Sequence, residues 1–137
     1  MTLVDSNVLL DILSHDRTWS DWSFRMLSRR SASGPLLINE TIYAEISVHI
    51  RSQAELDAIV DDLDVTLLRI PKPALFVAGK AYLKYRQAGG IRTGVLPDFF
   101  IGAHAQVTGL PILTRDARRY RAHFPEVEVI APEAEGV

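Results

Sequence analysis

The feature that most restricts the fold is an apolar helix followed directly by an apolar strand, within residues 96–116. Residues 99–107 are almost entirely apolar, so a helix here should be covered by the rest of the chain. Pro97 suits the first turn of this helix, and Gly109 suits its end. Residues 111–114 are short and apolar, which is typical of a strand in a parallel sheet covered on both faces. The stretch therefore predicts a buried helix packed onto a parallel sheet.

The same alternation of apolar strands and helices extends along the chain. Strands and helices that alternate in this way form α/β folds with a parallel sheet between layers of helices. We therefore predict an α/β/α sandwich with a mainly parallel central sheet, as one domain at residues 1–130 followed by a frayed acidic C-terminal tail at 131–137. The expected strands cover residues 2–4, 36–38, 65–68, 111–114 and 126–130. The expected helices cover 8–13, 19–30, 40–51, 53–63, 71–87 and a last stretch that has Pro97 in its first turn and ends at Gly109, with its apolar part at 99–107.

The spacing of side chains adds expectations about packing. Gly102 and Ala105 follow Asp98 on one helix face, so another element should approach that face closely. Residues 31–35 combine serine, glycine and proline, which predicts a loop. In the helix at 71–87 the large apolar side chains are the expected core contacts: Phe76, Val77, Tyr82 and Leu83.

Composition limits the class of protein. The 137-residue chain has a net charge of −2, so it could bind nucleic acid only through a local basic patch. It contains no cysteine, which excludes disulfides and thiolate metal sites and fits the reducing cytoplasm. No apolar run approaches the roughly 20 residues of a membrane span, and Asp5 and Asp11 within the first apolar stretch argue against a signal peptide. We therefore expect a cytoplasmic globular protein with no membrane partner.

Four acidic residues occupy positions that suit chemistry at one edge of such a sheet. Asp5 and Asp116 each follow an expected strand, and the ligands of α/β sheets gather at the carboxyl ends of the strands. Asp98 lies in the first turn of the buried helix. Glu45 lies within an apolar helix, where a carboxylate is costly to bury unless it is paired or bound to a metal.

Each of these acids also has a purely structural explanation. Asp5 could cap the first helix, although its neighbours could do so instead, and Asp116 could cap the turn that follows it. Asp98 could simply favour the helix dipole. Glu45 could be an exposed residue or could pair with His49 four positions later. Glu40 is expected to cap a helix. Asp11 and Asp16 are expected to lie in loops or on the solvent side.

Grouped carboxylates favour a hard divalent cation. Mg²⁺ and Mn²⁺ prefer oxygen ligands, and two carboxylates about 4 Å apart repel by about 4 kcal/mol at an effective dielectric constant of roughly 20 unless a cation offsets the charge. Such a cation can activate water and orient a phosphodiester. The four histidines share no ligand spacing, and the sequence has no glycine-rich phosphate loop. A cluster of arginines near Asp116 could hold phosphates or could simply face solvent: Arg115, Arg118, Arg119 and Arg121.

Four short motifs resemble those of PIN-domain proteins, and most of all those of the VapC toxins of bacterial type II toxin–antitoxin systems. The resemblance covers almost the whole chain and implies a PIN-like α/β/α fold with Mg²⁺-dependent endoribonuclease activity, Mn²⁺ being an alternative ion. It further implies an RNA substrate, a cognate antitoxin protein and a homodimer. The motifs are V-D-S-N at 4–7, N-E-T-I-Y-A-E-I at 39–46, L-P-D-F-F-I-G-A-H-A at 96–105 and L-T-R-D at 113–116.

The resemblance also assigns roles to residues. The direct metal contacts that it favours are Asp5 and Asp98, and the polar positions that support the site are Asn7 and Thr114. The family's acidic quartet, which supplies both the catalytic residues and the metal ligands, corresponds to Asp5, Glu45, Asp98 and Asp116. The RNA-binding candidates are Arg115, Arg118 and Arg119.

Two other functions stay open at this point. One is a PIN-like nuclease that acts on DNA or in RNA processing and has no toxin role. The other is a non-catalytic binding module whose acids are structural. The choice of RNA target depends on surface shape and on loops such as residues 91–95, so the acids do not predict it.

Overall fold

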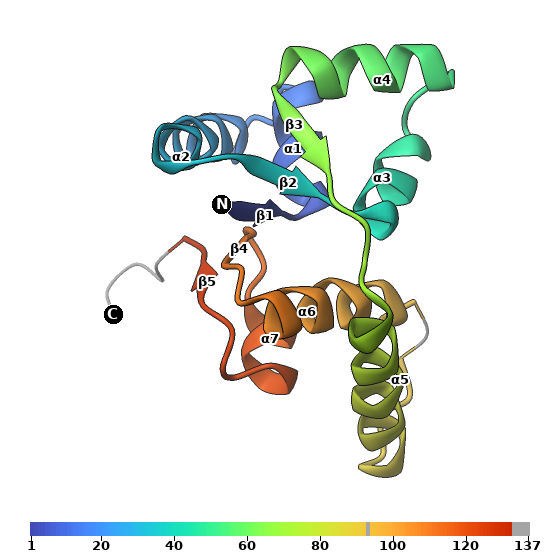
Figure 1. Ribbon diagram of the computed structural model, residues 1–137. Coiled ribbons are helices and arrows are strands. Elements are labelled where there is room, and N and C mark those ends of the chain that lie inside the picture. The colour runs from blue at the N-terminus through green and yellow to red at the C-terminus, as the bar shows by residue number, and fades with distance from the viewer. Residues whose placement is uncertain (93, 133–137) are drawn as a thin grey trace.

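Figure 1 shows the computed structural model of the chain, which describes residues 1–92 and 94–132. Within these residues, five strands form one parallel sheet in the order β3-β2-β1-β4-β5, and helices lie on both sides of it. The predicted α/β/α sandwich is therefore confirmed. The strands are β1 (Thr2–Val4), β2 (Leu36–Ile38), β3 (Val65–Leu67), β4 (Ile112–Leu113) and β5 (Val129–Ile130), and the helices are α1 (Ser6–Leu13), α2 (Ser20–Ser33), α3 (Glu40–Ser47), α4 (Gln53–Asp62), α5 (Lys72–Gln87), α6 (Leu96–Thr108) and α7 (Arg118–His123).

Strand β1 is the centre of the sheet, and its three residues are all buried. Leu3 pairs with Leu37 of β2 on one side and with Ile112 of β4 on the other. Because the strands are parallel, their carboxyl ends share one edge of the sheet, where α/β proteins place their ligands. The residues that directly follow β1, β2 and β4 along this edge are Asp5, Asn39 and Thr114.

Two apolar clusters make up the core. The larger one packs the sheet against α1, α3 and α6, with Val4, Ile38 and Ile101 among its fully buried residues. The second joins α5 to α6 and to the buried ring of Phe124. Helix α5 lies beside α6 and extends away from the sheet (Figure 1).

The predicted core contacts of α5 were partly wrong. Phe76 is 67% exposed and Leu83 is 48% exposed. The buried positions of this helix are Ala74 and Ala78, one turn apart on the face that meets α6. Small side chains let two helices approach closely, and the large apolar side chains on the other faces of α5 are then left at the surface.

Several predicted boundaries shift. Helix α2 continues through the first part of the expected loop at 31–35, because no strong helix breaker precedes Gly34, whose φ is 154°. Helix α3 ends four residues before the expected position at 51, and strands β4 and β5 are shorter than expected. In the part of the chain that the structure describes, no helix has both the length and the apolar character needed to cross a membrane.

Two expected segments reach beyond the described residues. The loop at 91–95 includes residue 93, and most of the tail at 131–137 falls on residues 133–137. Residue 93 and residues 133–137 lie outside the described part of the chain. The division into one domain at 1–130 and a tail therefore stays a prediction.

Asn39 caps α3 and also fixes a buried histidine. Its Oδ1 accepts a hydrogen bond from the Ile42 amide at 3.0 Å. Because that oxygen is already an acceptor, the amide nitrogen of Asn39 is the donor to His104 Nδ1, also at 3.0 Å. His104 is fully buried, and burial lowers its pKa, so the ring is neutral with its proton on Nε2. This histidine therefore has a structural role between α3 and α6.

Gly102 marks the close approach that the small residues on the Asp98 face predict. A Cβ atom at Gly102 would lie 2.3 Å from Cδ2 of Phe124, whose ring is buried. We expect Gly102→Ala to lower the free energy of unfolding by about 2 kcal/mol, a typical cost of overpacking a core. Urea unfolding measures the loss. Gly79→Ala is the matched control, because nothing lies within 4 Å of that position and alanine favours a helix; equal stability of the two variants would contradict this packing.

Candidate active site

Asp5 lies at the carboxyl end of the central strand and is only 6% exposed. It caps α1 through a hydrogen bond from the Ser6 amide to Oδ1 at 2.8 Å, so the structural explanation of this acid holds. Its other oxygen, Oδ2, accepts hydrogen bonds from Thr114 Oγ1 and from the Tyr120 hydroxyl, both at 2.9 Å. Three donors therefore fix the carboxylate in one orientation.

Thr114 links the ends of β1 and β4. Its hydroxyl donates to Asp5 and accepts hydrogen bonds from Asn7 Nδ2 and from the Asp116 amide, both at 3.1 Å. Asn7 in turn accepts from the Arg115 amide at 3.3 Å. Asn7 and Thr114 thus lie beside Asp5 and hold the loop after β4 against α1, which suits the supporting role that the resemblance implies for them.

Glu45 reaches this edge from α3. The helix is less buried than its apolar sequence predicts, because only Ile42 and Ile46 are buried and Glu45 is partly buried. Oε1 of Glu45 accepts a hydrogen bond from Ser6 Oγ at 3.2 Å, whereas His49 is exposed. The side chain therefore points toward the start of α1, next to Asp5.

The pKa values of these acids show that three carboxylates act on one another. Burial raises the pKa of Asp5 and the charge of Asp98 adds to the increase, while the hydroxyls of Thr114 and Tyr120 partly oppose it, so that the value is about 6. Burial, followed by the charges of Asp5 and Asp98, raises the pKa of Glu45 to about 7. Asp5, Glu45 and Asp98 therefore share one region of strong negative potential, which we call the acidic cluster.

Tyr120 is a member of the site that the sequence analysis missed. It lies on α7, is 2% exposed and donates its hydroxyl proton to Asp5. Burial and the surrounding carboxylates raise its pKa well above the usual value, so the hydroxyl stays protonated and remains a donor. Its sequence position, four residues after Asp116, is equally typical of an ordinary core tyrosine, so no sequence signal could have identified it.

Asp98 and Asp116 are both paired with arginines of α7. Asp98, in the first turn of α6, accepts a hydrogen bond from Nη1 of Arg119, and the pair is partly exposed. Asp116 is more peripheral: its side chain is 52% exposed and lies 3.4 Å from Nε of the exposed Arg118. Asp116 is joined to the acidic cluster only indirectly, through its amide and Thr114.

Arg115 has a different partner from the other two arginines. Its Nε lies 2.8 Å from Oδ2 of Asp11, and its guanidinium lies 5.8 Å from the centre of the Trp19 ring. Asp11 is 3% exposed, so the expectation that it faces solvent was wrong. The buried carboxylate is tolerated because Arg115 and the Ser23 hydroxyl both donate to it. Whether Arg115 contacts RNA stays a prediction.

The donor chemistry of the acidic cluster fits a hard divalent cation. Within residues 1–92 and 94–132, no three histidine or acidic side chains come close enough together to form a ready metal site. Burial is the main cause of the raised pKa values of Asp5 and Glu45, and repulsion among the carboxylates adds to it; a cation would offset that repulsion. Asp98 is the acid that an arginine already neutralises, so it could become a ligand only by leaving Arg119.

Comparison with known proteins agrees with this geometry. The sequence profile of the PIN domain matches residues 2–125, while the curated proteins contain no significant match. One similar solved structure is a toxin–antitoxin complex from Klebsiella pneumoniae, with 22% identity, a TM-score of 0.69 and coverage of 97% of this chain and 98% of that one. At such identities the likeness concerns the fold.

Two further solved structures have the same fold. VapBC2 from Rickettsia felis, bound to a DNA fragment from its promoter, is 12% identical, with a TM-score of 0.73 and coverage of 96% and 98%. DNA-bound VapBC from Salmonella typhimurium is 18% identical, with a TM-score of 0.68 and the same coverage. The profile match over most of the chain, on a parallel sheet with acids at its carboxyl edge, shows that this chain belongs to the PIN domain family.

Proposed function

We propose that this chain is the endoribonuclease toxin of a type II toxin–antitoxin system and hydrolyses RNA phosphodiester bonds with Mg²⁺. PIN domains are nucleases. The observation that carries the proposal is the electrostatic coupling of Asp5, Glu45 and Asp98 at the carboxyl end of the central strand. Asp116, at the edge of the acidic cluster, is the fourth proposed catalytic acid. Mn²⁺ is an alternative to Mg²⁺.

The hydrolysis joins the oxygen of a water molecule to phosphorus, breaks a backbone P–O bond and transfers a proton to the leaving oxygen. A bound Mg²⁺ would supply charge stabilisation and a lower pKa for water. Asp5, held by three donors, is the proposed rigid anchor for the ion. Glu45, which lies beside Asp5 and accepts a hydrogen bond from Ser6 at 3.2 Å, is the proposed acceptor of a proton from the attacking water. Arg118 and Arg119 would neutralise the phosphate.

The proposed partners are a cognate antitoxin and a second copy of this chain. Several of the similar structures are VapBC or other toxin–antitoxin complexes, which supports the antitoxin. Helix α5 also exposes large apolar side chains, and exposed apolar surface of this kind marks interaction sites. They are Leu75 (44% exposed), Phe76 (67%) and Leu83 (48%).

The function is tested by incubating the purified chain with labelled single-stranded RNA, duplex RNA and single-stranded DNA. We expect internal cleavage of RNA in Mg²⁺ or Mn²⁺ and none in EDTA. Cleavage of DNA instead of RNA would replace the proposed substrate, and the absence of cleavage together with absent metal binding would favour a non-catalytic module. Toxicity is measured separately, as growth arrest on induced expression.

Arg119 should compete with the metal for Asp98. The partly exposed ion pair is worth about 1 kcal/mol, so we expect Arg119→Gln to tighten Mn²⁺ binding about fivefold. Titration of free Mn²⁺ by electron paramagnetic resonance, without RNA, measures this affinity. Arg51→Gln is the matched control, because Arg51 pairs at 3.6 Å with the exposed Glu55, which is not a proposed metal ligand. Weaker binding in the Arg119 variant would show that the ion pair does not oppose the metal.

A further inference from the structure

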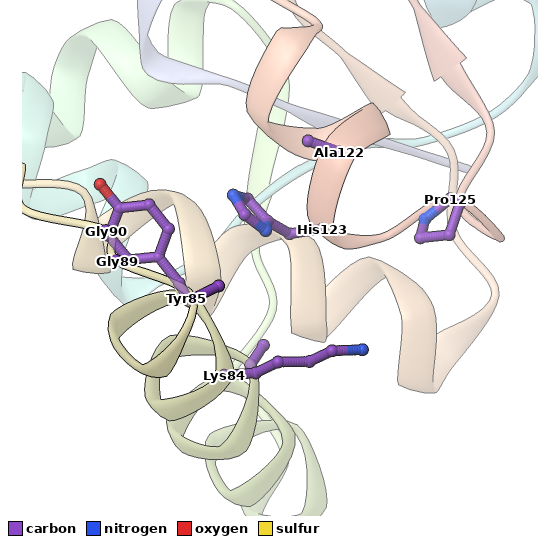
Figure 2. A pocket seen from close by; sticks show the side chains of 9 residues that line it. Lys84, Tyr85, Gly89, Gly90, Ala122, His123 and Pro125 are labelled. Atoms are coloured by element: carbon purple, nitrogen blue, oxygen red, sulfur yellow. The ribbon is translucent and has the colours of Figure 1, made fainter.

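A groove leads from the rim of the acidic cluster toward α5. A hollow of about 220 Å³ contains Asp116, Arg92 and Arg119 in its lining, and a hollow of about 490 Å³ lies beside it, between the C-terminal half of α5 and the end of α7. The two share Ala122 and His123 as a common wall. We call the combined hollow the Tyr85 groove; Figure 2 shows its larger part, with Tyr85, His123 and Lys84 around it.

One wall of the Tyr85 groove is aromatic and firmly held. The rings of Tyr85 and His123 are 5.4 Å apart, nearly perpendicular to each other, and both pack on the buried Phe99 ring at 5.6 Å and 4.9 Å. The Tyr85 hydroxyl oxygen also accepts a hydrogen bond from the Arg92 amide at 3.1 Å. Gly90 covers one side of the Tyr85 ring, where a Cβ atom would lie 2.5 Å from the nearest ring atoms. Both rings remain partly exposed, so a planar group can stack on the parts that line the larger hollow.

The charges around the Tyr85 groove are mostly positive, in a chain whose net charge is −2. Lys84 lines the larger hollow, and Arg92, Arg118 and Arg119 line the smaller one. Arg118 is paired with Asp116 and Arg119 with Asp98, so the excess positive charge comes from Lys84 and Arg92. Phosphate binding needs cations of this kind, and stacking needs the aromatic wall. The combination matches a nucleotide, which has a planar base and an anionic phosphate.

The size and position of the groove limit the ligand further. A hollow of about 490 Å³ falls within the range of sites that hold one ligand of small-molecule size. Duplex bases are stacked on one another and have no free faces, whereas an unpaired base does. Because the groove begins at Asp116 and Arg119, a nucleotide in it would lie next to a phosphate at the acidic cluster.

We propose that the Tyr85 groove binds one unpaired nucleotide of the substrate RNA beside the cleaved phosphodiester, with its base against Tyr85 and His123 and its two flanking phosphates toward Lys84 of the larger hollow and Arg92 of the smaller one. The proposal rests on the proposed function and deepens it, because it selects single-stranded RNA as the substrate. In this proposal the Tyr85 groove selects the substrate, and the acidic cluster cleaves it.

Binding of a fluorescein-labelled eight-nucleotide single-stranded RNA to the full chain in EDTA tests the proposal by fluorescence anisotropy. We expect Lys84→Glu to weaken binding about tenfold, whereas Lys80→Glu, an equal charge change on α5 outside the groove, should have little effect. Lys84→Ala should also lower the salt slope of binding by about one. A hairpin RNA without unpaired bases should bind at least tenfold more weakly than the single strand.

The aromatic wall is tested in the same assay. His123→Ala should weaken binding about tenfold and His123→Phe should restore it, since phenylalanine keeps a stacking face. Circular dichroism checks that each variant is folded. If His123→Ala unfolds, the binding measured for the Lys84 variants decides between the outcomes, because Lys84 is exposed and its replacement leaves the core unchanged. Equal effects of Lys84→Glu and Lys80→Glu, or equal affinity for single strand and hairpin, would overturn the proposal.

Cleavage of the same RNA in Mg²⁺ separates the two proposals. If the native chain cleaves RNA but the groove variants bind and cleave as it does, the groove proposal fails and the nuclease proposal stands. If binding depends on Lys84 and His123 but nothing is cleaved, the nuclease proposal fails and the groove stands as an RNA-binding site.

Discussion

Replacement of Asp5 by asparagine is expected to lower the rate of RNA cleavage about a thousandfold and to leave the chain folded. The carboxylate is the most buried acid of the acidic cluster and is oriented by Ser6, Thr114 and Tyr120. Loss of a metal-anchoring charge costs several kcal/mol of transition-state stabilisation, and about 4 kcal/mol corresponds to a thousandfold in rate. The measurement is the initial rate of cleavage in saturating Mg²⁺.

Asparagine has the same shape as aspartate, so the variant removes the charge without creating a cavity. Its amide can still accept the helix-capping hydrogen bond from Ser6. Asp62→Asn, on the exposed face of α4, is the matched control and should cleave RNA at the native rate. A rate within about threefold of native for Asp5→Asn, with the fold intact, would remove Asp5 from the catalytic residues.

In the absence of metal, the stability of the chain is expected to fall by about 3 kcal/mol as the pH rises from 4 to 7.5. The pKa of Asp5 is about 6 in the folded chain against 3.8 for the free side chain, so the folded state binds this proton more tightly. The resulting stability is fully present below pH 3.8 and is lost as the pH rises through 6. A difference of about two pKa units corresponds to about 3 kcal/mol.

The loss of the Glu45 proton should also lower the stability as the pH rises, at a slightly higher pH than for Asp5, because the pKa of Glu45 is raised from 4.5 to about 7. Urea unfolding in EDTA at pH 4, 5.5 and 7.5 measures the trend. Mg²⁺ at pH 7.5 should restore much of the lost stability, since a cation that binds only the folded chain favours it. Asp5→Asn should flatten the profile between pH 4 and 6; a native chain that is equally stable at all three pH values would contradict the coupled acidic cluster.

The local sequence was sufficient to predict the elements that frame the site. The apolar runs of β1 and β2 lie where they were expected, Asn39 caps α3, and Gly109 ends α6 with a φ of 72°. Each of these features depends on a few neighbouring residues, through periodicity, capping or backbone conformation. Parallel strands then bring Asp5 and the residues after β4 to one edge of the sheet, so that edge could also be predicted, whereas the approach of Glu45 and Asp98 to Asp5 was implied only by the resemblance.

Contacts between residues far apart in the chain were decided only by the tertiary structure. The sequence does not show that Tyr120 donates to Asp5, that Arg119 neutralises Asp98, or that Arg115 is held by a buried Asp11. The first two contacts depend on how α7 packs against the sheet and α6, which in turn depends on small residues such as Gly102 where the elements meet. The third depends on how the loop after β4 lies against α1. The chain's periodicity fixes which residues share a helix face, but the rotation and distance between two packed helices fix which charges meet.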